Sequence, residues 1–228
     1  MTDGEAVYIV GNDPAAAETM GRLFSSVHIE PRIFHSPLEF LETFSPDSPC
    51  CLVLEMRMPK LSGLELLTRL KQHGSRVPAI IATAYAEVTS AVRAMKLGAV
   101  EFLEKPVNEE LLLEYVQYWI GVNLAELDEI RKRAEMEEKL AKLSPRERDV
   151  LQGVLNGLSN KEMARELGVS PKAIELYRGK LMMKMAAPSL AALVRETLCS
   201  SVSKTCPCRG RYELPSDRHV SAWIGKPA

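Results

Sequence analysis

The first half of the chain alternates short apolar runs with longer amphipathic stretches. Apolar runs of strand length occupy residues 7–10, 29–34, 50–54, 78–82 and 99–103. Between most of them, apolar residues recur at the spacing of a helix with one buried face. These stretches cover residues 15–24, 64–70, 91–99 and 111–119. The alternation predicts an α/β domain in which five parallel strands form a doubly wound sheet with helices on both faces.

Polar residues stand where each predicted strand ends. In parallel α/β sheets, ligands bind outside the carboxyl ends of the strands, so these residues are the candidates for chemistry. An acid, a hydroxyl and an ammonium group would converge there. Contact with water alone would explain any one of these polar residues, but explains the whole set less well. The residues are Gly11, Asn12, Asp13, Glu55, Thr83 and Lys105.

A helix is expected to link the first half to the second. Residues 121–142 contain no proline and carry an apolar stripe from Leu124 to Ala134. The stripe predicts a linker helix at 122–142, about 20 residues or roughly 30 Å long. A sustained coiled coil is not expected, because Glu137 stands where its heptad needs an apolar residue.

Residues 143–198 have a helical pattern with clear start signals. Ser144 and Ser159 each precede a Glu by three positions, the sequence of a capping box, and Ser170 precedes a proline. Small and apolar residues around Gly168 have the spacing of a helix-turn-helix. This block is therefore expected to be an all-α domain of four helices.

Charge separates the two halves of the chain. The net charge of −1 divides into −6 for residues 1–122 and +3 for residues 143–198, with another +3 for residues 199–228. The C-terminal half would therefore meet any polyanionic partner. The apolar runs are too short to cross a membrane, and the N-terminus has no basic segment before its first apolar run, so we expect a cytoplasmic protein.

The last residues offer a weak metal motif. Cys206 and Cys208, together with Cys199 and His219, include ligand types that zinc prefers. Only one residue separates the first two, fewer than the usual zinc spacing. We therefore expect no metal site and interpret 199–228 as a flexible basic tail.

Four strings occur in order within residues 5–121: VYIVGNDP, LEMRMPKLSGLELL, IIATAYAE and AMKLGAVEFLEKP. In this order and spacing they resemble the receiver domain of two-component response regulators. The resemblance implies an aspartyl phospho-acceptor at position 55 and two Mg²⁺-binding acids at positions 11 and 12. It also implies that Thr83 and Lys105 contact the phosphate and that Phe102 is the switch aromatic. Lys105–Pro106 is a candidate for a cis bond.

This chain departs from that pattern at the chemical centre. Glu55 replaces the phospho-acceptor, Gly11 and Asn12 replace the two acids, and Asp13 matches the next position. Mg²⁺ requires charged oxygen ligands, so it should bind weakly or not at all, and no cofactor is expected. Without the metal, phosphotransfer loses its main charge neutraliser.

Glu55 has two interpretations. Its longer side chain could accept a hydrogen bond from Thr83 and pair with Lys105, as a built-in mimic of phosphate or a lock on one conformation. In the other interpretation the pocket has decayed, and Glu55 is a solvated surface acid.

The block at 143–198 carries its own resemblance. The string LSPRERDVLQGVLNGLSNKEMARELGVSPKAIELYRGKLMMKM, followed by SLAALVRETL, resembles the LuxR/FixJ-type DNA-binding domain. The resemblance implies that the helix at 171–186 enters the major groove. Ile174, Leu181 and Met185 are expected to face the core, with Leu176 partly buried. Arg178 and Glu175 are expected to read base edges, the lysines to meet phosphates, and Tyr177 to replace a common histidine. The expected DNA-binding residues are Lys172, Glu175, Tyr177, Arg178, Lys180 and Lys184.

The sequence therefore predicts a DNA-binding transcription regulator whose receiver works without aspartyl phosphorylation. It is not expected to be an enzyme, because it has no P-loop, nucleophile elbow or paired carboxylates at strand ends. Expected partners are double-stranded DNA, a second copy bound through residues 87–97 and 100–119 of the receiver, and a sensor kinase or other protein. The alternative is a receiver-like protein-interaction module for which DNA binding is secondary.

Overall fold

The computed structural model describes residues 5–45 and 48–201 of the chain. It divides into two compact units, with the boundary between residues 131 and 132 inside one continuous helix. The tail predicted at 199–228 lies almost entirely outside the described residues. In the part of the chain that the structure describes, no helix has both the length and the hydrophobicity that a bilayer span requires.

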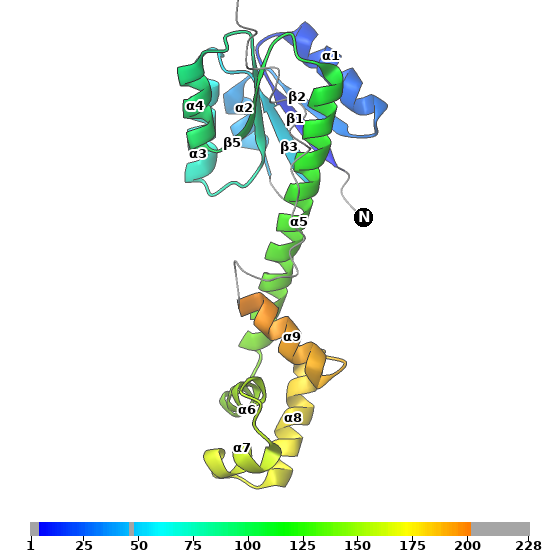
Figure 1. Cartoon of the computed structure of the whole chain (residues 1–228), viewed down its shortest axis with the longest axis vertical. Coiled ribbons are helices and arrows are strands. Elements are labelled where there is room, and N and C mark those ends of the chain that lie inside the picture. Colours follow the sequence, from blue (N-terminus) through cyan, green and yellow to red (C-terminus); the bar gives the residue numbers. More distant parts are fainter. Residues whose placement is uncertain (1–4, 46–47, 202–228) are drawn as a thin grey trace, which may run out of the picture. The chain divides into compact units, whose positions relative to one another are not determined.

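The first unit contains the five-stranded parallel sheet that the sequence predicts (Figure 1). Each neighbouring pair of strands is parallel, and the strand order is β2-β1-β3-β4-β5. The connections change direction between β1 and β3, so a ligand site is expected at the carboxyl ends of these two strands. The strands are β1 (Ala6–Val10), β2 (Glu30–Phe34), β3 (Cys50–Leu54), β4 (Ala79–Thr83) and β5 (Ala99–Glu104).

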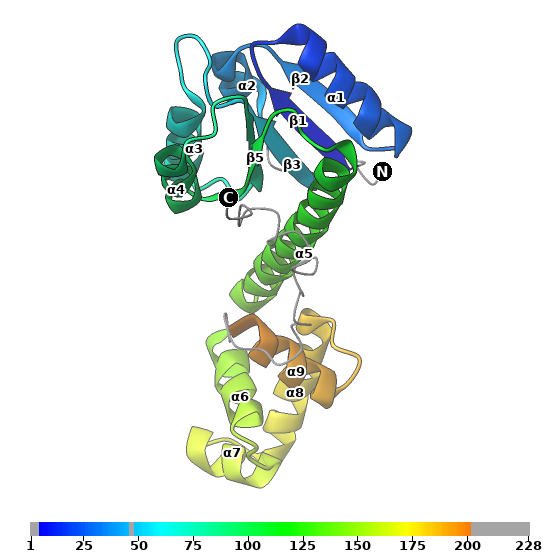
Figure 2. The ribbon, with the colours of Figure 1, turned by 45° about the horizontal axis from the view of Figure 1, so that its top comes forward.

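Helices cover both faces of this sheet, which confirms the predicted doubly wound fold (Figure 2). The core on one face includes residues of α1 and α5, such as Phe24 and Val116. The core on the other face includes residues of α2, α3 and α4, such as Phe40, Leu66 and Ala94. The helices are α1 (Pro14–Ser26), α2 (Pro37–Thr43), α3 (Gly63–Gln72), α4 (Val88–Leu97) and α5 (Glu109–Ala141).

The apolar pattern does not predict α2, which has only seven residues. Two local signals start it: the Ser36 hydroxyl accepts the Glu39 N–H, and Pro37 occupies the first turn. Its Phe40 is fully buried and lies edge-on to the rings of Tyr8 and Phe34. Aromatic packing across the sheet therefore holds a helix too short to be stable alone.

The linker expected at 122–142 is not a separate element, because α5 continues without a break to Ala141. Asn123 of this helix is buried and joins it to the amino ends of β3 and β4. Its Oδ1 accepts the Cys50 N–H at 3.0 Å, and its Nδ2 donates to the Arg76 carbonyl at 3.4 Å. The Arg76 guanidinium also pairs with Glu126 at 2.6 Å. These polar contacts hold α5 against the sheet beyond Ile120, the last α5 residue in the sheet's apolar core.

The second unit is helical, as predicted, and its helices start where the capping signals place them. Ser144 and Ser159 form complete capping boxes, and the Ser170 hydroxyl accepts the Ala173 N–H. Gly168 ends one helix in the left-handed conformation, with a φ of 65° that favours glycine. The core contains Val150, Met163, Ile174, Leu181 and Leu193. The helices are α6 (Pro145–Leu155), α7 (Asn160–Leu167), α8 (Pro171–Met185) and α9 (Leu190–Ser201).

Candidate functional site

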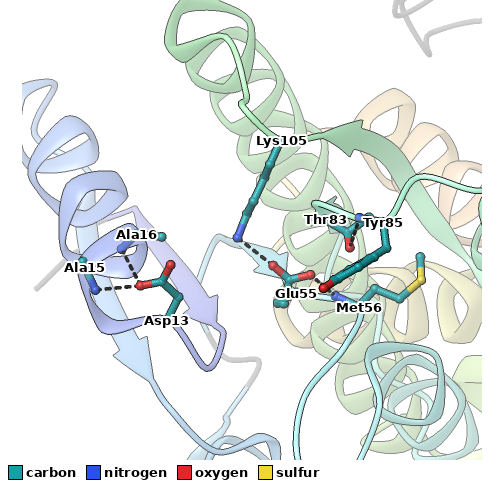
Figure 3. Close-up of polar contacts among 8 residues, drawn as sticks. All are labelled: Asp13, Ala15, Ala16, Glu55, Met56, Thr83, Tyr85 and Lys105. Atoms are coloured by element: carbon teal, nitrogen blue, oxygen red, sulfur yellow. Dashed lines mark hydrogen bonds and ion pairs between the residues drawn. The ribbon is translucent and has the colours of Figure 1, made fainter.

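The carboxyl end of the sheet has a small pocket that gathers most of the predicted strand-end residues. Figure 3 draws three of them, Asp13, Glu55 and Lys105. Its lining includes Gly11, Asn12 and Asp13 from the end of β1, Glu55 from the end of β3, and Lys105 from the end of β5. The pocket lies at the switch point between β1 and β3. The sheet topology thus brings together residues that are far apart in the sequence.

Glu55 and Lys105 form an ion pair in this pocket. Glu55 Oε2 lies 2.6 Å from Lys105 Nζ, and the two side chains are only 12% and 24% exposed. Glu55 Oε1 accepts the Met56 N–H at 2.9 Å. Both carboxylate oxygens therefore have a donor, and a charge-assisted bond occupies the lysine (Figure 3). Glu55 is consequently not the freely solvated acid of a decayed pocket.

Thr83 does not complete this arrangement as expected. Its side chain is fully buried, and its hydroxyl accepts the Tyr85 N–H at 3.2 Å. Among the described residues Thr83 and Glu55 share no hydrogen bond, and Figure 3 shows the Thr83 hydroxyl bonded to its own loop. The expected Thr83–Glu55 contact is therefore not made in this structure, where the hydroxyl accepts an N–H from the turn that follows β4. Glu55 therefore makes one of the two contacts expected of it, the ion pair with Lys105.

The residues at the end of β1 offer few ligands for Mg²⁺. Asp13 accepts the N–H groups of Ala15 and Ala16, which makes it the N-cap of α1. Gly11 has no side chain, and a Cβ placed on it would lie 3.5 Å from Cβ of Glu55. Within the described chain, no group of three or more His, Cys, Asp or Glu side chains could hold a metal ion. The donors present therefore do not fit Mg²⁺, which needs several hard oxygen ligands.

The remaining receiver predictions concern β5. Phe102 is partly buried and packs against the core that α3 and α4 cover. The Lys105–Pro106 bond is cis, as the sequence suggested. The role of Phe102 as a switch aromatic stays a prediction.

In the second unit, α8 has a buried face and an exposed face. Ile174, Leu181 and Met185 are buried, as predicted. Leu176 was expected to be partly buried but is 60% exposed, and Met183 on the same face is 80% exposed. The sequence could not separate the two faces of α8, because both carry apolar residues.

The expected DNA-binding residues divide between these faces. Lys172, Glu175 and Lys180 are exposed on α8. With Leu176 between the two lysines at one-turn spacing, they form an outward face, here defined as Lys172, Glu175, Leu176 and Lys180. This face combines two cationic side chains with an acidic and an apolar one.

Tyr177 and Arg178 are half-buried between this face and the core side of α8. Tyr177 packs against the domain core. The guanidinium of Arg178 donates to Oδ1 of Asn160, the first residue of α7. The structure therefore joins α7 to α8 through Arg178, a contact that the sequence analysis did not anticipate.

Lys184 was assigned to DNA phosphates, and in this structure its ammonium group is engaged within the domain. Its Nζ lies 2.7 Å from Glu147 Oε2 and 3.0 Å from the Lys142 carbonyl. Glu147 is only 3% exposed, and the bond from Lys184, followed by that from the Ser144 N–H, lowers its pKa to about 2. Lys184 therefore holds the end of α8 against the start of α6.

The pocketed parallel sheet and the capped helical unit together define a two-domain response regulator. Residues 7–117 match the family model of the response regulator receiver domain, and residues 141–197 match that of the bacterial regulatory proteins of the luxR family. Both matches coincide with the units seen in the structure.

Curated relatives match nearly the whole chain. The transcriptional regulatory protein FixJ of Azorhizobium caulinodans is 37% identical over 203 residues, covering 89% of this chain and 96% of that protein. FixJ of Bradyrhizobium diazoefficiens is 39% identical over 195 residues, covering 86% and 95%. Among solved structures, that of the response regulator StyR is 34% identical with a TM-score of 0.80, covering 86% of this chain and 98% of that one.

The chain therefore belongs to the FixJ-type response regulators of the LuxR family. It is a DNA-binding transcriptional regulator rather than an enzyme.

Proposed function

We propose that the receiver of this regulator works without phosphorylation, with the Glu55–Lys105 pair holding it in one conformation. The 2.6 Å contact between these side chains carries the proposal. The lysine that would contact an incoming phosphate is already bound to a carboxylate, so the pair supplies one contact of the phosphorylated state permanently. Because Thr83 does not take part, the arrangement is a lock with partial mimicry rather than a full substitute for phosphate.

The small number of Mg²⁺ ligands in the pocket supports the same proposal. The pocket has Gly11 and Asn12 where two acids would bind Mg²⁺, and Asp13 is engaged at the start of α1. A phosphoryl group passing to Glu55 would lack the charge neutralisation that phosphoryl transfer requires. We therefore expect weak Mg²⁺ binding or none.

Intact-mass measurement after incubation with acetyl phosphate and Mg²⁺ tests this proposal. The wild-type chain should gain no phosphoryl mass, and Glu55→Asp alone should also gain none. The triple variant Gly11→Asp, Asn12→Asp, Glu55→Asp should become phosphorylated, since the space beside Gly11 accepts a Cβ in ordinary contact. Phosphorylation of the wild type at Glu55 would contradict the proposal.

We further propose that the locked receiver forms a homodimer through α4 and the neighbouring β5 and α5. Helix α4 exposes Val88, Val92 and Met95 at 78%, 47% and 48%. Their spacing places them along one side of the helix. Exposed apolar side chains gathered in this way are typical of a protein-binding surface.

The same exposed surface also supports the alternative of an interaction module that binds a different protein, such as a sensor kinase. Gel shifts with genomic fragments, using the chain with and without residues 5–121, separate the two functions. If the chain is a transcription regulator, the shifts should be sequence-specific and should weaken when the receiver is removed. An interaction module with secondary DNA binding would show weak shifts of equal strength for all fragments.

For DNA, we propose that the outward face of α8 enters the major groove. Lys172 and Lys180 would contact phosphates, and Glu175 could accept from a cytosine amino group. Leu176 would contact the methyl group of a thymine. We assign Arg178 to positioning α7 against α8 in place of its predicted base contact, because Asn160 already holds its guanidinium.

A further inference from the structure

A second group of side chains connects two loops beside the Glu55 pocket. Arg57, two residues after Glu55, belongs to the loop between β3 and α3. Its guanidinium carbon lies 3.8 Å from the centre of the Tyr85 ring, in the loop between β4 and α4. Its Nη2 also lies 3.7 Å from Oε1 of Glu87 in that same loop. One side chain of the first loop thus contacts two side chains of the second.

The helix that follows the second loop has few other attachments at its start. Glu87 is the N-cap residue of α4, and in the described chain its side chain makes no capping hydrogen bond. Ala94 is the one residue of α4 that is fully buried, and Val88 in its first turn is 78% exposed. A helix start without a cap or buried anchor has a low free energy of local opening. The position of this first turn therefore depends strongly on its loop.

Two contacts of Tyr85 join the loop between β4 and α4 to its surroundings, one to the end of β4 and one to the loop that follows Glu55. The Tyr85 N–H donates to the buried hydroxyl of Thr83 at the end of β4. The Tyr85 side chain stacks under Arg57, and Arg57 follows Glu55 and the buried Met56 in the chain. A displacement of either loop would therefore change the contact between Arg57 and Tyr85.

We propose that Arg57 is a positioning residue that fixes the loop between β4 and α4, together with the first turn of α4, against the pocket loop. It thereby connects the loop that follows Glu55 to the start of α4, the helix with the exposed apolar side. Arginine suits this role because its planar guanidinium can stack on an aromatic ring and pair with a carboxylate at the same time. A lysine ammonium could pair with Glu87 but would stack less well.

Hydrogen exchange of the full-length chain, read from peptides covering the first turns of α4, tests this proposal. Arg57→Ala should speed amide exchange there by about two- to fivefold, the loss expected for one exposed cation–π contact. Arg57→Lys should give a smaller change. The matched control is Lys71→Ala, which removes one exposed positive charge from α3 and should leave α4 unchanged. Peptides from β1 should exchange alike in all variants, which shows that the fold is retained.

A double-mutant cycle shows whether the two side chains act through one contact. Tyr85→Ala should speed exchange in α4 by itself. Because Tyr85 is 53% exposed, its removal should not prevent folding. The variant lacking both side chains should exchange no faster than the faster single variant. If Arg57→Ala behaves like Lys71→Ala, or if the effects of the two single changes multiply in the double variant, the proposed role of Arg57 is wrong.

Discussion

One methylene group distinguishes Glu55 from the aspartate that the family resemblance implies at this position. Its extra length places the carboxylate 2.6 Å from the Lys105 ammonium, in a pocket where both groups are largely shielded from water. A partly buried ion pair loses much of its value if either partner is removed, because the remaining charge is left without compensation. The pair therefore favours whichever receiver conformation keeps it closed.

The ionisation of Glu147 predicts how the stability of the second unit depends on pH. Its pKa is lowered from 4.5 to about 2 in the folded chain, so the ionised carboxylate favours the folded state. This stabilisation is fully present above about pH 4.5 and is lost as the pH falls toward about 2. Glu147→Gln should therefore speed amide exchange in α6 at pH 7, and its difference from wild type should shrink below pH 4.5.

The control is Glu166→Gln, which removes an exposed carboxylate from α7 in the same unit. It should have little effect at either pH. A Glu147→Gln effect that stays constant from pH 7 to pH 3 would show that packing, and not the charge, is what Glu147 contributes.

The exposed position of Leu176 on α8 predicts that it contacts a base, which can be tested by changing the DNA. Leu176→Ala should weaken binding to the specific site by roughly 1 kcal/mol, about the free energy of burying one methyl group against it. Replacing the contacted thymine by uracil should weaken wild-type binding similarly and leave Leu176→Ala almost unaffected. Fluorescence anisotropy with each thymine replaced in turn measures both. If no single uracil distinguishes the two proteins, Leu176 does not contact a thymine methyl.

Two further substitutions define the other roles on α8. Lys180→Ala should weaken specific and random DNA alike and reduce the salt slope by about one phosphate contact. Arg178→Ala should also weaken both kinds of DNA, because it disturbs the α7–α8 pair and not a single base contact. If Arg178→Ala instead loses the ability to discriminate at one base pair, Arg178 contacts that base directly.

At the scale of elements, the proposed dimer depends on the exposed apolar side of α4. Val92→Glu should place a charge in the centre of the exposed apolar side and convert the expected micromolar dimer to monomer in sedimentation velocity. Thr19→Glu, an equivalent change on the exposed side of α1, should leave the dimer intact. A wild-type chain that is monomeric at these concentrations would remove the basis for this interface.

The sequence predicts elements well where a local signal decides them. The buried strands β1, β3 and β4 are continuous apolar runs, and Ser144, Ser159 and Ser170 start their helices through neighbouring N–H groups. The topology of a parallel sheet then places Glu55 and Lys105 at the same edge of the sheet. These features follow from short-range chemistry and from the layering rules of α/β sheets.

Features that depend on distant packing could not be predicted in the same way. Lys184 pairs with Glu147, 37 residues earlier, and nothing in its own helix indicates this. The faces of α8 are ambiguous because Leu176 and Met183 make its outer side as apolar as parts of its core side. Thr83 is a local case: it was expected to reach Glu55, but among the described residues the two share no hydrogen bond, and its hydroxyl accepts the Tyr85 N–H in its own turn.

At the scale of the whole molecule, the proposed regulator consists of a receiver that works without a phosphoryl group and a domain that binds DNA. A phosphorylation-dependent regulator binds its site more tightly when a phosphodonor is present. A regulator locked by Glu55 and Lys105 should have its DNA affinity without any donor, and its affinity should depend on the pair instead.

The most direct test is a DNA titration of the full-length chain with and without acetyl phosphate and Mg²⁺, repeated for Glu55→Gln. The account predicts the same Kd for the wild type under both conditions. It also predicts a weaker Kd for Glu55→Gln, because a neutral amide cannot maintain the ion pair with Lys105. Tighter DNA binding by the wild type in acetyl phosphate, or an unchanged Kd for Glu55→Gln, would contradict it.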